Sequence, residues 1–256
     1  MSTRRARFTA TRCGISAIGG GHEDSTVKTL GLIGGMSWES SAHYYRLINQ
    51  GVRDARGPTA SAKCLLWSFD FSEIEALQRA GEWVRLEALM CDAAQRLAGA
   101  GAEALVICTN TMHRMADAVE AAAGLPLLHI ADPTGAAVRA AGIETVALMG
   151  TAFTMEQGFY RGRLAARHGL DVLVPEAEDR ALVHRVIYDE LVAGVVSEQS
   201  RAAYRGVIAR LIERGAEAVI LGCTEIMLLV DQSDSAVPLF DTTALHAAAA
   251  VELALS

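Results

Sequence analysis

Two residues that could do chemistry stand directly after apolar runs of the same kind. Cys223 follows "AVILG" (218–222), and Thr109 follows "ALVIC" (104–108). The thiol of Cys223 could act as a base or a nucleophile. We expect a helix over Glu225–Val230 to begin beside it, to lower its pKa from a reference of about 8.5 and to offer N–H groups to an anion. A free cysteine is also commonly a small buried hydrophobic residue, but the polar setting "GCTE" favours the reactive role.

An internal repeat indicates which residue of the first run corresponds to Cys223. The segment "GAEALVICTNTM" (101–112) aligns without a gap to "GAEAVILGCTEI" (215–226). Thr109 then pairs with Cys223, and Cys108 pairs with Gly222. Because successive strand residues point to opposite faces, we expect Cys108 to be the last core residue of its strand and Thr109 to face Cys223. Thr109 could also cap the following helix.

Polar neighbours at these two strand ends could bind a small charged molecule without any lysine. Asn110, Thr111 and Thr224 supply an amide and hydroxyls that could hold a carboxylate. Glu225 could orient an ammonium group, or it could simply be a favourable acid in the first turn of a helix.

A glycine-rich segment is the third candidate site. "GLIGGMSWESS" (31–41) has neither the GxGxxG spacing nor a following P-loop lysine, so it is a weak phosphate loop. We expect its glycines to let a ligand approach the backbone, with Met36 and Ser37 at the end of the strand. The corresponding "GTAFTMEQGFYRGR" (150–163) carries Arg161 and Arg163, which could pair with a substrate carboxylate or lie on a solvated helix face. We assign ordinary structural roles to the histidines at 113 and 129.

Alternating strand-like and helical segments must position these residues. The segments 39–52 and 82–101 have helical spacing of apolar residues, and continuous apolar runs lie between the helical patterns. Those runs are 29–35, 63–69, 104–108, 126–130, 145–150, 171–175, 218–222 and 237–241. Apolar runs separated by helices indicate parallel strands that are covered on both faces.

The repeat extends to the whole α/β unit. "TLGLIGGMS" (29–37) resembles "TVALMGTAF" (145–153), at nearly the same separation as the first pair of segments. We therefore expect two pseudo-symmetric three-layer α/β domains with parallel sheets facing one cleft. The first would span 27–131 plus 242–256, and the second 132–241. Ligands bind outside the carboxyl ends of parallel strands, so each half would contribute one residue to the site.

Composition excludes several classes of protein. The 256 residues are 51% hydrophobic and carry a net charge of −7, which argues against a nucleic-acid or anionic-membrane partner. No stretch approaches the roughly 18 uninterrupted apolar residues of a membrane span. The five cysteines are scattered without a CxxC pair, and the seven histidines show no HExxH spacing, so we expect a reducing, cytoplasmic location and no metal. Lys28 and Lys63 are the only lysines, which makes a pyridoxal phosphate Schiff base a poor expectation.

The first 26 residues differ from the rest of the chain. They contain four arginines before their first acid, Glu23, and a run of three glycines at 19–21. We expect a disordered tail over 1–26. An Arg- and Ser-rich transit peptide is the alternative, and a translation start at Val27 is a further hypothesis.

The motifs resemble the aspartate/glutamate racemase family, and within it the branch of broad-specificity or L-aspartate/glutamate-specific amino-acid racemases. The resemblance covers nearly all of 28–256. It rests on "LGLIGGMSWESSAHYYRLIN" (30–49), "CTNTMH" (108–113), "GTAFTMEQGFYRGRL" (150–164) and "GCTEIMLLV" (222–230). It implies a small-molecule amino-acid substrate, no cofactor and a homodimer. It also implies substrate contacts at Met36, Gln78, Thr109 to Thr111, Thr224 and Glu225.

The family's usual mechanism uses two cysteines on opposite sides of the substrate Cα, one to remove a proton and one to return it. This sequence has Thr109 where the first cysteine usually stands, as does the branch with "CTNT". We therefore assign Cys223 as the main base and Thr109 as the opposite proton donor, and we expect unequal rates in the two directions or one-directional exchange. A single-cysteine decarboxylase or isomerase of the same superfamily is an alternative, and so is a non-catalytic amino-acid-binding protein.

Overall fold

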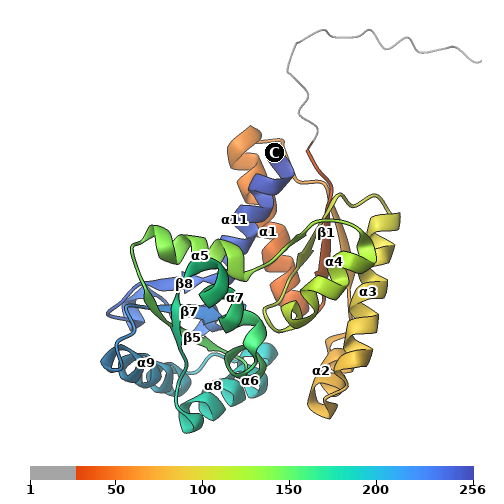
Figure 1. Ribbon diagram of the computed structural model, residues 1–256. Coiled ribbons are helices and arrows are strands. Elements are labelled where there is room, and N and C mark those ends of the chain that lie inside the picture. The colour runs from red at the N-terminus through yellow and green to blue at the C-terminus, as the bar shows by residue number, and fades with distance from the viewer. Residues whose placement is uncertain (1–26) are drawn as a thin grey trace, which may run out of the picture.

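The computed structural model describes residues 27–256, which form two α/β halves, each built on a four-stranded parallel sheet (Figure 1). The first sheet has the order β2-β1-β3-β4 and the second β6-β5-β7-β8, so the same arrangement occurs twice. The strands are β1 (Leu30–Gly34), β2 (Cys64–Ser68), β3 (Ala104–Ile107), β4 (Leu127–Leu128), β5 (Thr145–Gly150), β6 (Asp171–Leu173), β7 (Ala218–Gly222) and β8 (Leu239–Asp241). The expected fold class, two similar parallel α/β units, is confirmed.

Helices connect the strands and cover both faces of each sheet (Figure 1). The first half contains α1 (Trp38–Arg56), α2 (Phe71–Ala80), α3 (Trp83–Gly99), the short 3-10 helix η1 (Thr111–Met115) and α4 (Ala116–Ala123). After these come α5 (Ala131–Ala140), α6 (Ala152–Glu156), α7 (Gly158–His168), α8 (Ala177–Asp189), η2 (Leu191–Ala193), α9 (Glu198–Glu213), α10 (Ile226–Leu229), η3 (Gln232–Asp234) and α11 (Thr242–Leu255).

The central strands are buried because they are apolar along their whole length. Every residue of β1, β3 and β7 is buried, and hydrophobic clusters lie on both faces of each sheet. The edge strand β2 is only partly buried. This burial matches the continuous apolar runs, which distinguish central parallel strands from the alternating pattern of a half-exposed sheet.

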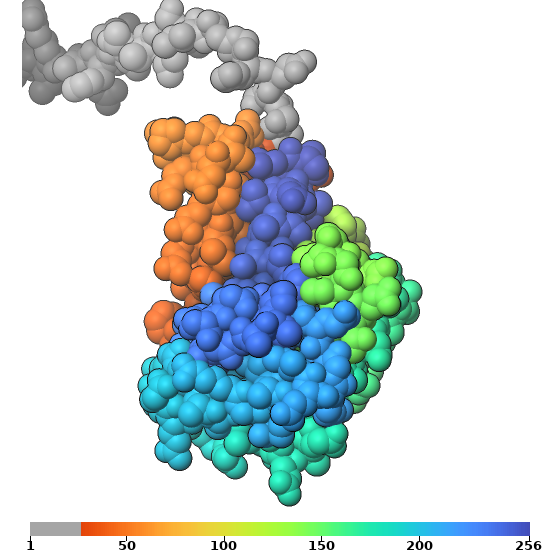
Figure 2. Space-filling view, turned by 90° about the vertical axis from the view of Figure 1, so that its left-hand side faces the viewer, coloured from red at the N-terminus to blue at the C-terminus, as the bar shows by residue number. Residues whose placement is uncertain are grey.

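The last helix returns to the first half of the molecule. α11 lies alongside α1 in both views (Figures 1 and 2). Its small residues Ala247, Ala250 and Ala254 pack with Tyr44 and Ile48 of α1 in one core cluster over the first sheet. Small side chains at helical spacing permit this close approach of two helices. The backbone N–H of residue 28 donates to the carbonyl of residue 254 at 2.8 Å, which fixes the end of α11 beside the start of the described chain.

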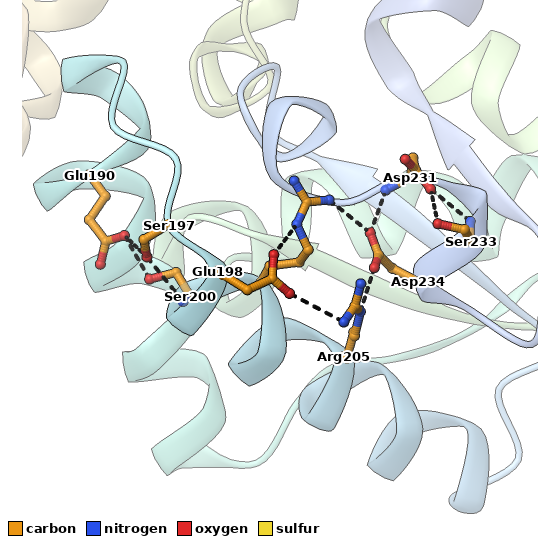
Figure 3. Close-up of polar contacts among 9 residues, drawn as sticks. Glu190, Ser197, Glu198, Ser200, Arg205, Asp231, Ser233 and Asp234 are labelled. Atoms are coloured by element: carbon orange, nitrogen blue, oxygen red, sulfur yellow. Dashed lines mark hydrogen bonds and ion pairs between the residues drawn. The ribbon is translucent and has the colours of Figure 1, made fainter.

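A buried carboxylate anchors the segment that follows α10. The Asp234 side chain is fully buried and accepts hydrogen bonds from Arg201 at 3.3 Å and from Arg205, both on α9 (Figure 3). Asp231 and Asp234 also form a reciprocal capping box around η3. Burial alone would raise the pKa of Asp234, but the Asp231 N–H and the Arg205 guanidinium outweigh it and lower that pKa. The network ties the segment after α10 to α9.

The expected strands agree with the observed ones to within about two residues at each end, which is the ordinary uncertainty of element boundaries. The division into 27–131 with 242–256 and 132–241 stays a prediction. The expected tail over 1–26 lies outside the described residues. Within 27–256, no helix is long and apolar enough to cross a membrane.

Candidate active site

One cavity lies where the carboxyl ends of the central strands from both halves meet. Thr109, which follows β3, and Cys223, which follows β7, both line it. The empty space between the lining side chains, with the open mouth included, is about 370 Å³. The lining residues are Met36, Phe71, Gln78, Thr109, Asn110, Thr111, Thr151, Ile187, Tyr188, Val192, Gly222, Cys223 and Glu225.

Most of the residues expected from the sequence therefore come together. Those that line the cavity are Met36, Gln78, Thr109, Asn110, Thr111, Cys223 and Glu225. Ser37 and Thr224 do not line it directly, but both donate hydrogen bonds to the Glu225 carboxylate, at 2.9 Å and 2.7 Å. They form the wall behind that residue.

Arg161 is the exception and requires a correction. It lines a separate hollow on the second half, together with Asp171 and Val172 of β6. The helix α7 buries Tyr160 and Leu164 in the core, and a residue one position after Tyr160 is turned about 100° away from that face. Arg161 therefore does not reach the cavity that contains Cys223.

Arg163 is also occupied elsewhere. Its guanidinium makes two parallel hydrogen bonds to the Asp132 carboxylate, at 2.6 and 2.7 Å. This paired geometry is the strong form of an arginine–carboxylate contact. Arg163 connects α7 to α5 and is a structural residue.

Cys108 and Thr109 point into different environments, as the repeat predicts. Cys108 is fully buried in the cluster between the first sheet and helices α1 and α11, and burial raises the pKa of its thiol. Thr109 is half-buried and lines the cavity. Its expected role as a helix cap is wrong, because Asn110 occupies the position before η1 and makes no side-chain capping bond.

The thiol of Cys223 is hydrogen-bonded to a carboxylate. Its Sγ donates to Oε2 of Glu225 at 3.0 Å. Burial and the neighbouring negative charge of Glu225 raise the pKa of Cys223 well above its ordinary value. The expected lowering by a helix N-terminus is therefore wrong. The helix α10 has four residues and starts only at Ile226, so its dipole is small beside a full charge 3 Å away.

Glu225 joins the two halves of the molecule. Its Oε1 accepts from Ser37 at 2.9 Å and lies 2.7 Å from Ser40 Oγ, and both serines belong to the first half. Its Oε2 accepts from Cys223 and Thr224. Ser40 also lies 2.6 Å from Thr224 Oγ1, so its single proton is directed to one of two acceptors at a time. The carboxylate thus has donors on both oxygens.

Asn110 presents an unpaired acceptor inside the protein. The Thr242 hydroxyl donates to the carbonyl of Leu221 at 2.9 Å, so it must accept from Asn110 Nδ2, at 3.1 Å. This fixes the orientation of the amide. The opposite atom, Oδ1, is buried and has no hydrogen-bond partner. A buried unpaired acceptor beside a cavity is a favourable place for a ligand N–H.

Two further polar pairs cross the cavity between the halves. The Thr111 hydroxyl shares a hydrogen bond with Thr151, at 3.0 Å. Tyr188 of α8 donates to Gln78 Oε1 at 3.0 Å, and Gln78 Nε2 donates to Met112 Sδ at 3.4 Å. Gln78 is only 5% exposed, although it lies on the short helix α2.

A buried histidine, His113, supports the backbone of Thr109 and contacts two further buried histidines. The His113 ring lies at a steep angle to the rings of His129 and His246, with ring centres 4.6 and 5.5 Å away. The N–H of Ile130 donates to His113 Nε2, so Nδ1 carries the proton that is donated to the Thr109 carbonyl at 2.7 Å. Burial lowers the pKa of all three histidines, that of His129 and that of His246 to about 3. The structural roles expected for His113 and His129 agree with these contacts.

The glycine-rich segment 31–41 was expected to let a ligand approach the backbone, but in the structure Gly35 serves close packing within the protein. Gly35 has a φ of 81° and would, with a β-carbon, collide with the backbone of Phe69. Its N–H donates to Ser41 Oγ at 2.8 Å. The close approach is therefore between β1 and the chain after β2, not between the backbone and a ligand. This packing places Met36 at the cavity.

Sequence reasoning missed several lining residues. Phe71, Ile187 and Val192 are apolar, and nothing in their local sequence distinguishes them from core residues. Ser40 had a usable signal, because it lies one helical turn after Ser37 in "SWES" and so shares its face. Within 27–256, no group of three His, Cys, Asp or Glu side chains could hold a metal ion.

Comparison with known proteins agrees with this architecture. Residues 33–250 match the family model described as Asp/Glu/hydantoin racemase. A candidate Asp/Glu racemase from Yersinia pestis is 55% identical, with a TM-score of 0.84 over 90% of this chain and 100% of that one. An aspartate racemase homologue from Pyrococcus horikoshii is 31% identical, with a TM-score of 0.76 over the same shares. Aspartate racemase from Picrophilus torridus, 21% identical over 89% of this chain and 94% of that one, shares the fold with a TM-score of 0.70. The chain therefore belongs to the Asp/Glu/hydantoin racemase family.

Proposed function

We propose that this protein is a cofactor-independent amino-acid racemase that exchanges the proton at Cα, with Cys223 as the main base and Thr109 on the opposite side. One observation carries the proposal. The two residues follow equivalent strands of a duplicated fold and line one cavity, and the thiol already has a proton acceptor in Glu225. The family membership supports the same class of reaction.

Glu225 gives the thiol a way to become a base. When a substrate ammonium enters beside the sulfur, it offsets the negative charge of the thiolate that forms as Oε2 of Glu225 takes the Sγ proton. The thiolate then removes the Cα proton, and the electron pair left on Cα is delocalised into the substrate carboxylate. A thiol held neutral until substrate arrives is also protected from oxidation, because the thiolate is the reactive form.

Thr109 provides the second face of the reaction. Its hydroxyl donates a proton to the planar intermediate and regains one through water at the cavity mouth, and Glu225 releases to that water the proton that it took from Cys223, which restores the starting state. A threonine hydroxyl is a far weaker base than a thiolate, so proton removal from the Thr109 side is the harder step. The two faces of the site are therefore chemically unequal.

The polar contacts suggest how an amino acid would lie. The unpaired Oδ1 of Asn110 receives the α-ammonium group, which places the positive charge near Glu225. The α-carboxylate lies against the hydroxyl of Thr109 and the neighbouring backbone N–H groups. Met36, Gln78 and Thr111 complete the enclosure. A homodimer in the cytoplasm remains part of the proposal.

Single enantiomers provide the test. Purified protein is incubated with L- or D-forms of acidic and neutral amino acids, and the products are separated by chiral chromatography. Appearance of the opposite enantiomer with unchanged total amino acid supports the proposal. Loss of a carboxyl group as CO₂ would indicate the decarboxylase alternative, and binding without any exchange of the Cα proton would indicate an amino-acid-binding protein.

A further inference from the structure

We infer that the hollow lined by Arg161 is a second binding site, which takes a small zwitterion with an apolar body, such as an aliphatic α-amino acid. The hollow lies beside α7 and the edge strand β6, and it shares no lining residue with the cavity that contains Cys223. Its empty space, with the open mouth included, is about 620 Å³. The lining residues are Glu156, Gly158, Arg161, Gly162, Ala165, Leu170, Asp171 and Val172.

The cation of this hollow has no counter-ion. Arg161 forms no ion pair with any residue of the described chain, and its Nε is buried without a hydrogen-bond partner. The other two arginines of α7 are occupied, because Arg163 and Arg167 contact the Asp132 carboxylate at 2.6 and 3.3 Å. A buried N–H without an acceptor is unfavourable. A ligand carboxylate beside Arg161 would satisfy it with a charge-assisted hydrogen bond.

An acid without a partner lines the same hollow. Asp171 lies at the exposed start of β6, and its side chain makes no hydrogen bond or ion pair within residues 27–256. The other acid of the lining, Glu156, pairs with Arg180 at 3.0 Å. The unpaired charges of the hollow are therefore one cation and one anion, which do not contact each other. This arrangement is complementary to a ligand that carries both charges, with its carboxylate at Arg161 and its ammonium at Asp171.

Small residues of α7 keep the floor of the hollow open. Gly158, Gly162 and Ala165 are spaced so that they share the helix face of Arg161. A β-carbon built on either glycine would meet no atom within 4 Å. Glycine is unfavourable inside a helix, and close packing does not require it at position 162. The space over these residues is thus available to a ligand.

The rest of the lining suits an aliphatic side chain. Leu170 and Val172 precede and follow Asp171 in the chain, and both belong to the core beneath the hollow. Contact with them removes apolar ligand surface from water, which favours binding. A single ligand can therefore use the cation, the acid and the apolar floor at the same time.

Hydrogen–deuterium exchange followed by mass spectrometry locates the ligand on the full chain. We expect L-leucine at about 20 mM, which saturates a site with a Kd of about 1 mM, to slow amide exchange in peptides that cover 158–172. Cys223→Ala should keep this protection. Arg161→Gln and Gly162→Leu should lose it, the first by removing the charge and the second by filling the space. Arg167→Gln changes the same charge on the same helix outside the hollow, and it should keep the protection.

Two results of that experiment would overturn the inference. One is the absence of any protection by leucine in the unmodified protein. The other is protection that survives both Arg161→Gln and Gly162→Leu, because the ligand would then lie elsewhere. The comparison does not require Cα exchange, so failure of the proposed racemase function leaves it intact.

Leucine analogues that lack one charge test the chemistry of the ligand. 4-Methylpentanoate keeps the carboxylate without the ammonium, and 3-methylbutylamine keeps the ammonium without the carboxylate. Each should need at least tenfold more ligand than leucine for half-maximal protection of 158–172. Asp171→Asn should weaken leucine at least tenfold and leave 4-methylpentanoate unchanged. Equal half-maximal concentrations of leucine and 4-methylpentanoate, or of leucine and inorganic phosphate, would show a simple anion site and overturn the inference.

A second copy of the chain is the competing occupant of this hollow. Exchange is therefore measured over a range of protein concentrations. Protection of 158–172 that rises with protein concentration and does not respond to leucine would assign the hollow to contact between copies, and it would overturn the amino-acid site. Protection that follows leucine at every protein concentration supports the site.

Discussion

The Sγ atom of Cys223 lies 3.0 Å from Oε2 of Glu225 and donates a hydrogen bond to it. This contact reverses the usual expectation for a cysteine that follows a parallel strand. The carboxylate holds the thiol in its protonated form, and the same carboxylate is bonded to serines of the opposite half. The proton affinity of the Cys223 thiol is therefore coupled to the contact between the two halves.

Glu225→Gln should lower the pKa of the Cys223 thiol. Removing the negative charge removes one of the causes that raise this pKa, whereas burial remains. The pH dependence of alkylation by iodoacetamide, followed at Cys223 by peptide mass spectrometry, measures the change. The double variant Cys223→Ala/Glu225→Gln identifies the background from other thiols. A pKa that stays the same or rises would show that Glu225 does not control the thiol.

Cys223→Ala should lower Cα exchange about 10³-fold, a typical loss for a general base. Cys108→Ala is the matched control, because Cys108 is buried away from the cavity. It should keep most of the activity and cost about 1 kcal/mol of stability, as a modest core truncation does. Loss of activity in folded Cys108→Ala would mean that the repeat alignment is displaced by one residue.

The unequal faces of the site should appear in isotope exchange. Enantiomers have equal free energy, so kcat/KM must be the same in the two directions. The expected asymmetry therefore concerns two other quantities: kcat, and the rate at which solvent hydrogen is incorporated at Cα (wash-in). In D₂O, the enantiomer whose Cα–H faces Cys223 should gain deuterium with retention faster than it inverts. NMR of each recovered enantiomer measures this.

Thr109 variants test the same asymmetry from the other side. Thr109→Ala should reduce inversion about 10²-fold while keeping wash-in from one enantiomer. Thr109→Cys adds a second thiol and should make wash-in more nearly equal for the two enantiomers. Symmetric wash-in in the unmodified protein would contradict unequal faces.

Acid should destabilise the protein through its buried histidines. The folded-state pKa values of His129 and His246 are about 3, below the unfolded value near ~6.5. Between these values the unfolded chain binds protons that the folded chain does not. Stability is therefore complete above about pH 6.5 and falls with pH, by about 1.4 kcal/mol per pH unit for each histidine.

Urea unfolding at pH 7, 6 and 5 measures this slope. His129→Gln should make the slope shallower by about one proton and should leave the ordering of Thr109 by His113 in place. A slope that is the same in the variant would show that His129 titrates normally in the folded protein.

The buried carboxylate of Asp234, which anchors the segment after α10, should also contribute to stability. Asp234→Asn removes the charge that two arginines contact and should lower the free energy of unfolding, measured in urea, by about 1–2 kcal/mol. The loss is this small because both guanidinium groups are partly exposed to solvent. Glu198→Gln is the control, since Glu198 contacts the same arginines from an exposed position. It should have little effect, and equal losses in both variants would contradict a special role for the buried carboxylate.

The fold was predictable because its signals repeat. The alternation of apolar runs and helical patterns indicates parallel sheets, and the match of 101–112 to 215–226 indicates two of them. The same match separates Cys108 from Thr109 correctly, because the side-chain period of a strand is two. The cavity-lining positions of Thr109 and Cys223, which directly follow strands, were therefore predictable from the sequence.

Other features depend on contacts between distant segments. The pKa of Cys223 could not be predicted from a strand–helix boundary, because a carboxylate two residues later turns back to the thiol. Arg161 looked suitable by type but lies on the wrong face of α7. The apolar wall at Phe71, Ile187 and Val192 consists of ordinary hydrophobic residues that become a site only when the two halves meet.

The position of α11 has a consequence for the order in which the protein can fold during synthesis. The core over one face of the first sheet includes Ala247, Ala250 and Ala254, so it cannot close until residue 254 has left the ribosome. The strands β5 to β8 lie within 145–241 and are complete earlier. The first half is therefore translated first but completed last. One face of its sheet stays uncovered until α11 packs against it.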